Sequence, residues 1–73
     1  MQTRATTPSW FVEFRLAWIK ESLEIFGIIK REHIMKKFGT STAQASLDLR
    51  EVRRRWPDLC EYDLSEKIYK VKS

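Results

Sequence analysis

Residues 38 to 49 read Phe38-Gly39-Thr40-Ser41-Thr42-Ala43-Gln44-Ala45-Ser46-Leu47-Asp48-Leu49, and they join the end of one amphipathic segment to the start of another. Gly39 is suited to ending a helix, because glycine adopts the left-handed backbone conformation without steric cost. Ser41 and Gln44 have the Ser-x-x-Gln spacing of a capping box, in which Ser41 accepts from the Gln44 backbone N–H and the Gln44 side chain bonds back to the cap. Two helices joined by a short turn that contains glycine predict a helix-turn-helix, whose second helix can enter the major groove of DNA.

The second helix is predicted from Thr42 to Arg54 or Arg55, and its two faces differ in character. The inner face is apolar and predicts core positions at Ala45, Leu49 and Val52, with Trp56 just beyond. The outer face is small or polar near its beginning and arginine-rich near its end, with Ala43, Leu47, Arg50 and Arg54 flanked by Thr42, Gln44, Ser46 and Arg53. This order is typical of a helix whose first half contacts bases while its second half contacts phosphates.

The surrounding segments predict a winged helix-turn-helix, which is a mainly α fold with a small β-hairpin. Ile28-Ile29-Lys30 is short and β-branched, so we expect a single short strand there. A helix is predicted over Arg31 to Phe38. Its inward side is predicted to hold Ile34, Met35 and Phe38. Leu59 to Tyr62 and Lys67 to Val71 predict two strands joined by residues 63–66, and this hairpin forms the wing, whose residues 62–70 we expect on the DNA backbone.

A longer first helix is predicted from Pro8 or Ser9, with Thr7 or Ser9 as its cap, to Gly27. It carries two apolar stripes. The first stripe, a predicted core, contains Val12, Leu16, Ile19, Leu23 and Phe26. The second, mostly aromatic, contains Trp10, Phe11, Phe14, Trp18 and Ile25. Arg15 and Ser22 separate the stripes on one side.

Two interpretations of the aromatic stripe stay open. Both stripes can pack inside a compact fold, or the aromatic one can be a homodimer interface with Trp18 near its centre, since large exposed aromatic patches usually mark association sites. A two-fold dimer would hold two recognition helices about 34–36 Å apart, facing successive major grooves of a palindromic site.

Length, charge and cysteine content limit the class of protein. A chain of 73 residues makes one domain, predicted over residues 9–73 after a flexible N-terminus at residues 1–8. The net charge is +4, and residues 31–73 hold ten basic and seven acidic side chains against four and three in residues 1–30, which favours a polyanionic partner. The single cysteine, Cys60, allows no disulfide framework and predicts a reduced compartment. The sequence shows neither an apolar run of membrane-spanning length nor a signal peptide, so we expect a cytoplasmic protein without a membrane partner.

The run FGTSTAQASLDLREV, followed by PDLCEYDLSEKIYKV, resembles the N-terminal winged-helix domain of bacterial WYL-domain transcription regulators, which include dimeric repressors of phage-defence loci. A more distant likeness is to DeoR-type repressors. The matching residues are Phe38, Gly39, Ser41, Gln44, Ala45, Ser46, Asp48 and Leu49, with Tyr62, Lys67 and Tyr69 in the wing. In that family a ligand-sensing WYL domain begins where this sequence ends. The resemblance therefore implies either an isolated domain of a longer regulator or a short relative without a sensor.

The resemblance implies that four residues lie near bases, namely Thr42, Gln44, Ser46 and Leu47. Gln44 can read adenine with two hydrogen bonds or be occupied in the capping box, and Leu47 can touch a thymine methyl or be partly buried. Contacts to the DNA backbone are expected from Ser41, Arg50, Arg53, Arg54, Lys67 and Lys70. The alternative for the arginine run is a solvated helix end that compensates the helix dipole.

The sequence gives little support for metal binding or catalysis. His33 has no partner at metal-ligand spacing, Cys60 is expected to pack as a small apolar side chain, and the sequence has no nucleophile–base arrangement or phosphate-binding glycine loop. We therefore expect no enzymatic activity, cofactor or metal. The predicted function is sequence-specific binding of double-stranded DNA by a transcription regulator, most simply a repressor. The alternative is a protein-interaction module that uses the aromatic face of the first helix and binds no nucleic acid.

Overall fold

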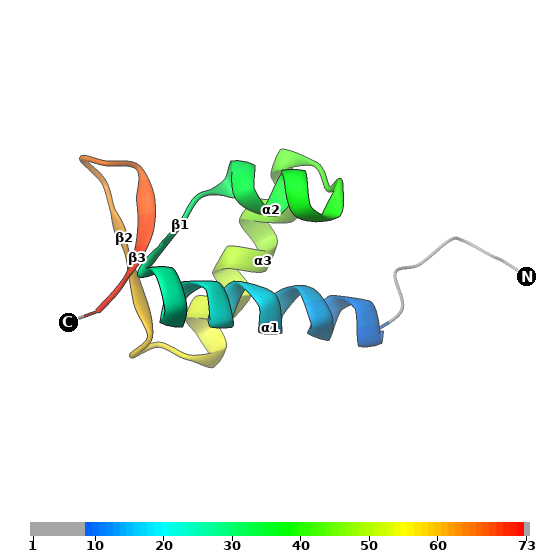
Figure 1. Ribbon diagram of the computed structural model, residues 1–73, viewed down its shortest axis with the longest axis horizontal. Helices are drawn as coiled ribbons and strands as arrows, with labels where there is room; N and C mark the ends of the chain where they lie inside the picture. The colour runs from blue at the N-terminus through cyan, green and yellow to red at the C-terminus, as the bar shows by residue number, and fades with distance from the viewer. Residues whose placement is uncertain (1–8, 73) are drawn as a thin grey trace, which may run out of the picture.

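The computed structural model describes residues 9–72, which form three helices and a small antiparallel sheet. In chain order the elements are α1 (Ser9–Phe26), β1 (Ile28–Ile29), α2 (Arg31–Phe38), α3 (Thr42–Arg55), β2 (Cys60–Asp63) and β3 (Ile68–Val71). Figure 1 shows α1 running beside α2 and α3, with the sheet at the end where α1 stops. The predicted fold class, a mainly α winged helix-turn-helix with a hairpin, is confirmed.

Element boundaries agree with the predictions to within one or two residues. Ser9 is the first residue of α1 and so is not its cap, and the other proposed start and cap residues, with the whole predicted flexible segment 1–8, lie outside the described residues. Both strands of the wing begin one residue later than predicted. Leu59 belongs to the turn that follows α3, and Lys67 closes the turn of the wing.

The core lies where α1 crosses α3, and it contains most of the predicted apolar positions. Its fully buried members are Leu16, Ile19, Leu23, Ile29, Ile34, Ala45, Leu49 and Val52. Phe26 was predicted in this core and is 75% exposed, so that prediction is wrong. The chain turns at Gly27, where φ is 84° and the N–H donates to the Leu23 carbonyl, and Ile29 rather than Phe26 then continues the core.

Part of the aromatic stripe of α1 packs against the rest of the fold, and part of it is exposed to solvent. Phe38 of α2 inserts against it, with ring centroids 6.0 Å from Phe11 and 5.4 Å from Trp18, which are both half-buried. Trp10 is 70% exposed and Phe14 55% exposed, although the Phe14 ring still touches Phe38 edge-on. Each of the two interpretations of this stripe therefore describes part of it.

The sheet has the strand order β1-β3-β2, with β3 in the centre. Its register pairs Ile29 with Tyr69 and Tyr69 with Tyr62, and the Val71 N–H donates to the Gly27 carbonyl, which ties the sheet to the end of α1. Cys60 is buried as expected, and this burial raises the pKa of its thiol. Within residues 9–72, no helix combines the length and the apolar character that crossing a bilayer requires.

Candidate nucleic-acid interface

The turn between α2 and α3 has the predicted chemistry at its first and last positions. Gly39 has φ of 67°, and its N–H donates to the Met35 carbonyl at 2.7 Å. Ser41 Oγ accepts from the Gln44 N–H at 3.1 Å, which satisfies one of the free amides at the start of α3. The Gln44 side chain does not complete the capping box, contrary to prediction, because its Nε2 donates instead to Asp48 Oδ1 at 2.9 Å.

Asp48 draws Gln44 inward because it belongs to a buried ion pair. Arg15 of α1 and Asp48 of α3 are each 3% exposed, and the guanidinium contacts both carboxylate oxygens, at 2.7 and 3.1 Å. The sequence placed Arg15 and Ser22 between the two stripes on one side of α1, and both residues are buried. Their burial and the ion pair of Arg15 were not predicted, because both depend on how α1 packs against the rest of the fold.

A groove of about 410 Å³ brings three elements together at the start of α3. It is lined by Thr42 and Ser46 of α3, by Arg31 at the start of α2 and by Lys67 of the wing. Arg31 Nη1 donates to Ser46 Oγ at 3.1 Å, so the cation lies directly beside a predicted base reader. Figure 1 shows the turn of the wing, α2 and the first turn of α3 on the side of the molecule away from α1.

Two cations of this groove, Lys30 and Arg31, were missed by the sequence reasoning. The sequence feature that could have identified them is their position at the very start of α2, the first helix of the helix-turn-helix motif. That end of α2 lies beside the exposed helix, whereas Lys36 and Lys37 at its other end line a separate apolar groove with Trp18.

The turn of the wing is organised by Asp63. Its Oδ1 accepts from Ser65 Oγ at 2.9 Å and from the Glu66 N–H at 3.0 Å, and its Oδ2 lies 3.0 Å from Lys70 Nζ. These contacts lower the pKa of Asp63 to about 2, with the backbone hydrogen bond from Glu66 as the largest cause. Of the two predicted phosphate contacts on the wing, Lys70 is thus paired within the chain, whereas Lys67 stands exposed at the end of the turn.

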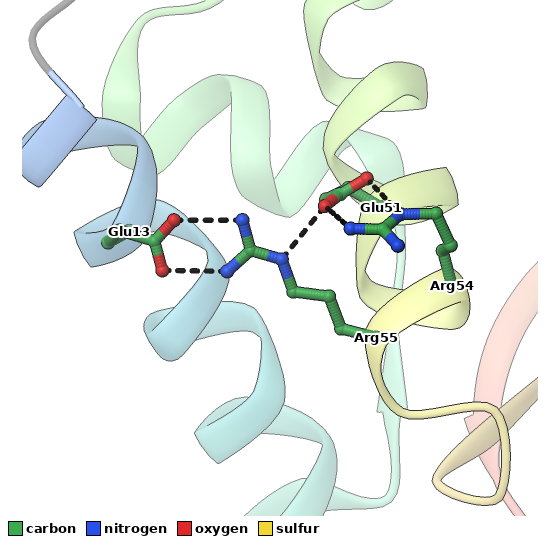
Figure 2. A network of polar contacts seen from close by, with 4 residues as sticks. All are labelled: Glu13, Glu51, Arg54 and Arg55. Atoms are coloured by element: carbon green, nitrogen blue, oxygen red, sulfur yellow. Dashed lines mark hydrogen bonds and ion pairs between the residues drawn. The ribbon is translucent and has the colours of Figure 1, made fainter.

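The arginine run at the other end of α3 is divided among three roles. Figure 2 shows Arg55 between Glu13 of α1 and Glu51 of α3, with Arg54 on the far side of Glu51. The hydrogen bonds from Arg54 and Arg55 lower the pKa of Glu51 to about 2. Arg53 instead stacks its guanidinium over the Tyr69 ring at 5.9 Å.

Arg55 therefore ties the end of α3 to α1, while the arginines of α3 that were predicted to contact phosphates stay at the surface. Arg50, Arg53 and Arg54 are exposed and line a groove of about 530 Å³ together with Lys72 of the chain end. Twelve residues separate Thr42 from Arg54, which corresponds to about 18 Å along a helix. The predicted base readers and these arginines thus occupy opposite ends of α3.

A helix-turn-helix whose second helix exposes one face, followed by a β-hairpin whose turn carries a lysine beside that helix, defines a winged helix-turn-helix domain. Residues 8–73 match the family model of the BrxR transcriptional regulator winged helix-turn-helix domain, and the chain belongs to that family. Two similar curated proteins, one from Escherichia coli strain KTE188 and one from Escherichia coli, are each described as the DNA-binding transcriptional repressor CapW. Both are 43% identical to this chain over 61 residues. The alignment covers 84% of this chain and 20% of each relative, so the chain spans about a fifth of their length.

Proposed function

We propose that this domain binds double-stranded DNA sequence-specifically, as the DNA-binding part of a transcription repressor. The first half of α3 enters the major groove, where Thr42, Gln44, Ser46 and Leu47 face the bases. The wing and the start of α2 contact the flanking phosphates. Membership of a family of regulator domains and the CapW relatives support this proposal, which treats the domain as a binding module rather than an enzyme.

The observation that carries the proposal is the groove at the start of α3. Arg31 and Lys67 come from elements 36 residues apart, yet both line this groove beside Thr42 and Ser46. Cations gathered in a groove beside an exposed polar helix start suit a helix that lies next to the phosphate backbone, because phosphate contacts set the position while base contacts set the specificity. Ser41, Arg50, Arg53, Arg54 and Lys70 are the further phosphate contacts of the proposal.

The direct test is binding of the 73-residue chain to the duplex upstream of its own operon, with a scrambled duplex as comparison. Each phosphate contact contributes about −0.9 to the slope of log affinity against log salt concentration, so about four to six contacts predict a steep loss of affinity. A flat salt response, or no binding to either duplex at low salt, would overturn the proposal. Arg31→Ala should reduce affinity, whereas the matched control Lys36→Ala should not, although both remove one positive charge.

A second proposal concerns association of two copies through α1. Trp10, Phe14 and Ile25 are exposed and lie within about 60° of one another around the helix, whereas Phe11 and Trp18 are half-buried against Phe38. Burying a large apolar side chain contributes about 1.5–3 kcal/mol, so two such surfaces can offset the cost of association. We propose a homodimer centred on Trp10 and Phe14. The same surface would serve the alternative function, a protein-interaction module that binds no nucleic acid.

The relatives are much longer than this chain, so the proposal also concerns a longer parent protein. Because the matched region is 20% of each CapW sequence, we propose that such a parent uses this domain for DNA contact and a sensor domain for regulation. Cytoplasmic localisation follows from a partner that is genomic DNA.

A further inference from the structure

The buried pair of Arg15 and Asp48 lies directly under the start of α3, in contact with a proposed base reader. The guanidinium donates from Nε to Asp48 Oδ2 at 2.7 Å and from Nη2 to Oδ1 at 3.1 Å. Such a two-point pair uses both carboxylate oxygens of Asp48 as hydrogen-bond acceptors. A buried ion pair is costly to desolvate and is often no more stabilising than apolar side chains of similar size, so packing alone does not account for it.

The acceptor role of Asp48 dictates how the Gln44 carboxamide is turned. Both oxygens of Asp48 accept from the Arg15 guanidinium, whereas a carboxamide has an NH₂ donor and a carbonyl acceptor. The distance of 2.9 Å between Gln44 Nε2 and Asp48 Oδ1 fits the only favourable arrangement, with the nitrogen toward Asp48. The opposite orientation would bring two acceptors together, so the carbonyl oxygen of Gln44 points away from Asp48.

We propose that Arg15, acting through Asp48, turns Gln44 into a reader of adenine. The bond to Asp48 uses one N–H of the carboxamide and leaves one N–H and the carbonyl oxygen for a base edge. Adenine presents an N7 acceptor and an N6 donor in the major groove, which match these two groups, whereas guanine presents two acceptors and would face the carbonyl oxygen. Arg15 and Asp48 are positioning residues in this scheme, and the inference rests on the proposed DNA binding.

The first test compares the unaltered chain with Gln44→Ala on a series of related duplexes. Duplexes enriched from a randomised library at low salt supply the probe, and each adenine is replaced in turn by guanine, by 7-deazaadenine or by purine without the N6 amino group. At one adenine of the site, guanine should lower affinity by about 5- to 150-fold, and each analogue by part of that factor. Gln44→Ala should be insensitive to all three replacements at this adenine and remain sensitive elsewhere.

The second test separates orientation from packing. In Arg15→Met/Asp48→Asn the charges are gone and residue 48 keeps its shape, but the new amide can meet Gln44 in either orientation. This variant should bind the adenine and guanine duplexes with closely similar affinity, while Arg15→Lys, which keeps the cation and the carboxylate, should retain the preference for adenine. A matched control removes the exposed pair of Lys20 and Glu24 on α1 by Lys20→Gln/Glu24→Gln and should leave the preference unchanged.

Two results would overturn the inference while leaving the proposed function intact. One is an unaltered chain that binds its selected duplex but responds to the analogues, at every adenine, in the same way as Gln44→Ala. The other is a folded Arg15→Met/Asp48→Asn variant, checked by circular dichroism, that keeps the adenine-to-guanine ratio of the unaltered chain. Failure of the unaltered chain to retain any duplex from the library would instead overturn DNA binding, and with it this inference.

Discussion

Lys67 occupies the left-handed backbone region, with φ of 58°, at the end of the turn that Asp63 organises. A residue other than glycine is strained in this region by about 1 kcal/mol. The lysine also places a cation in the groove beside Thr42 and Ser46. The position thus combines a local structural cost with a proposed contact to phosphate.

Lys67→Gly should separate these two roles. We expect the free energy of unfolding to stay unchanged or to rise by up to about 1 kcal/mol, since glycine relieves the strain but gains entropy in the unfolded chain. DNA affinity should fall, and the salt slope should lose about 0.9. Urea denaturation and fluorescence anisotropy measure the two quantities. Lys67→Ala is the control that keeps the strain; equal DNA binding by both variants and the unaltered chain would remove Lys67 from the interface.

Base reading and phosphate anchoring should respond differently to single substitutions. Gln44→Ala and Ser46→Ala are expected to weaken the preferred duplex more than random DNA, with loss of a bidentate pair costing about 1–3 kcal/mol. Arg54→Ala and Lys67→Ala should weaken both kinds of DNA by a similar factor. Competition binding with the two duplexes measures this, and an equal loss from Gln44→Ala on both would exclude it as a base reader.

At the scale of the elements, α3 is capped at its beginning and tied to α1 at its middle and its end. Ser41 caps its beginning, and Arg55 ties its last turn to Glu13 of α1 at 2.7 and 2.8 Å. Asp48 holds its middle to α1 through Arg15. The two links to α1 fix how the helix is presented, while its exposed side remains available to a partner.

The attachment at the end of α3 predicts a dependence of stability on pH. Hydrogen bonds from Arg54 and Arg55 lower the pKa of Glu51 from its ordinary 4.5 to about 2, so the folded state binds fewer protons than the unfolded state between these values. The contribution of Glu51 is complete above about pH 4.5 and is lost as the pH falls toward 2. The free energy of unfolding, measured by urea denaturation at pH 6, 4 and 3, should fall less steeply with pH in Glu51→Gln than in the unaltered chain. A decline identical to that of the unaltered chain would contradict this assignment.

For the whole molecule, the division of the aromatic stripe changes which substitution tests dimerisation. Trp18 is half-buried against Phe38 and carries Lys37 over its ring, so Trp18→Glu would damage the fold as well as any interface. Phe14 is more than half exposed and is the better position.

We expect the unaltered chain to sediment as a dimer and Phe14→Glu to give a folded monomer. Binding to a palindromic duplex should become much weaker, because the two half-sites are no longer held by one particle. Sedimentation equilibrium and circular dichroism measure association and folding. Leu64→Glu, at an exposed apolar residue of the wing, is the matched control for association. An unaltered chain that stays monomeric at all concentrations and still binds the palindrome tightly would exclude the interface.

Much of the architecture follows from local patterns that the sequence displays openly. The two glycines that end α1 and α2, the Ser41 cap and the apolar face of α3 were all predicted at their observed positions. Helical period, caps and turn residues act over a few neighbouring residues, so they can be recognised without knowledge of the rest of the chain. Membership of the regulator family was predicted from the same motif and is confirmed.

The polar connections between elements could not be predicted in this way. Arg15 and Asp48 are 33 residues apart, and Arg55 and Glu13 are 42 apart. Periodicity shows which side of each helix is apolar, but the crossing of α1 over α3 selects which polar side chains meet. The same packing left Phe26 outside the core and placed Arg31 beside Ser46. The sequence therefore specified the elements and the exposed helix, whereas the tertiary contacts set the orientation of Gln44, because that orientation depends on a charge carried by a different helix.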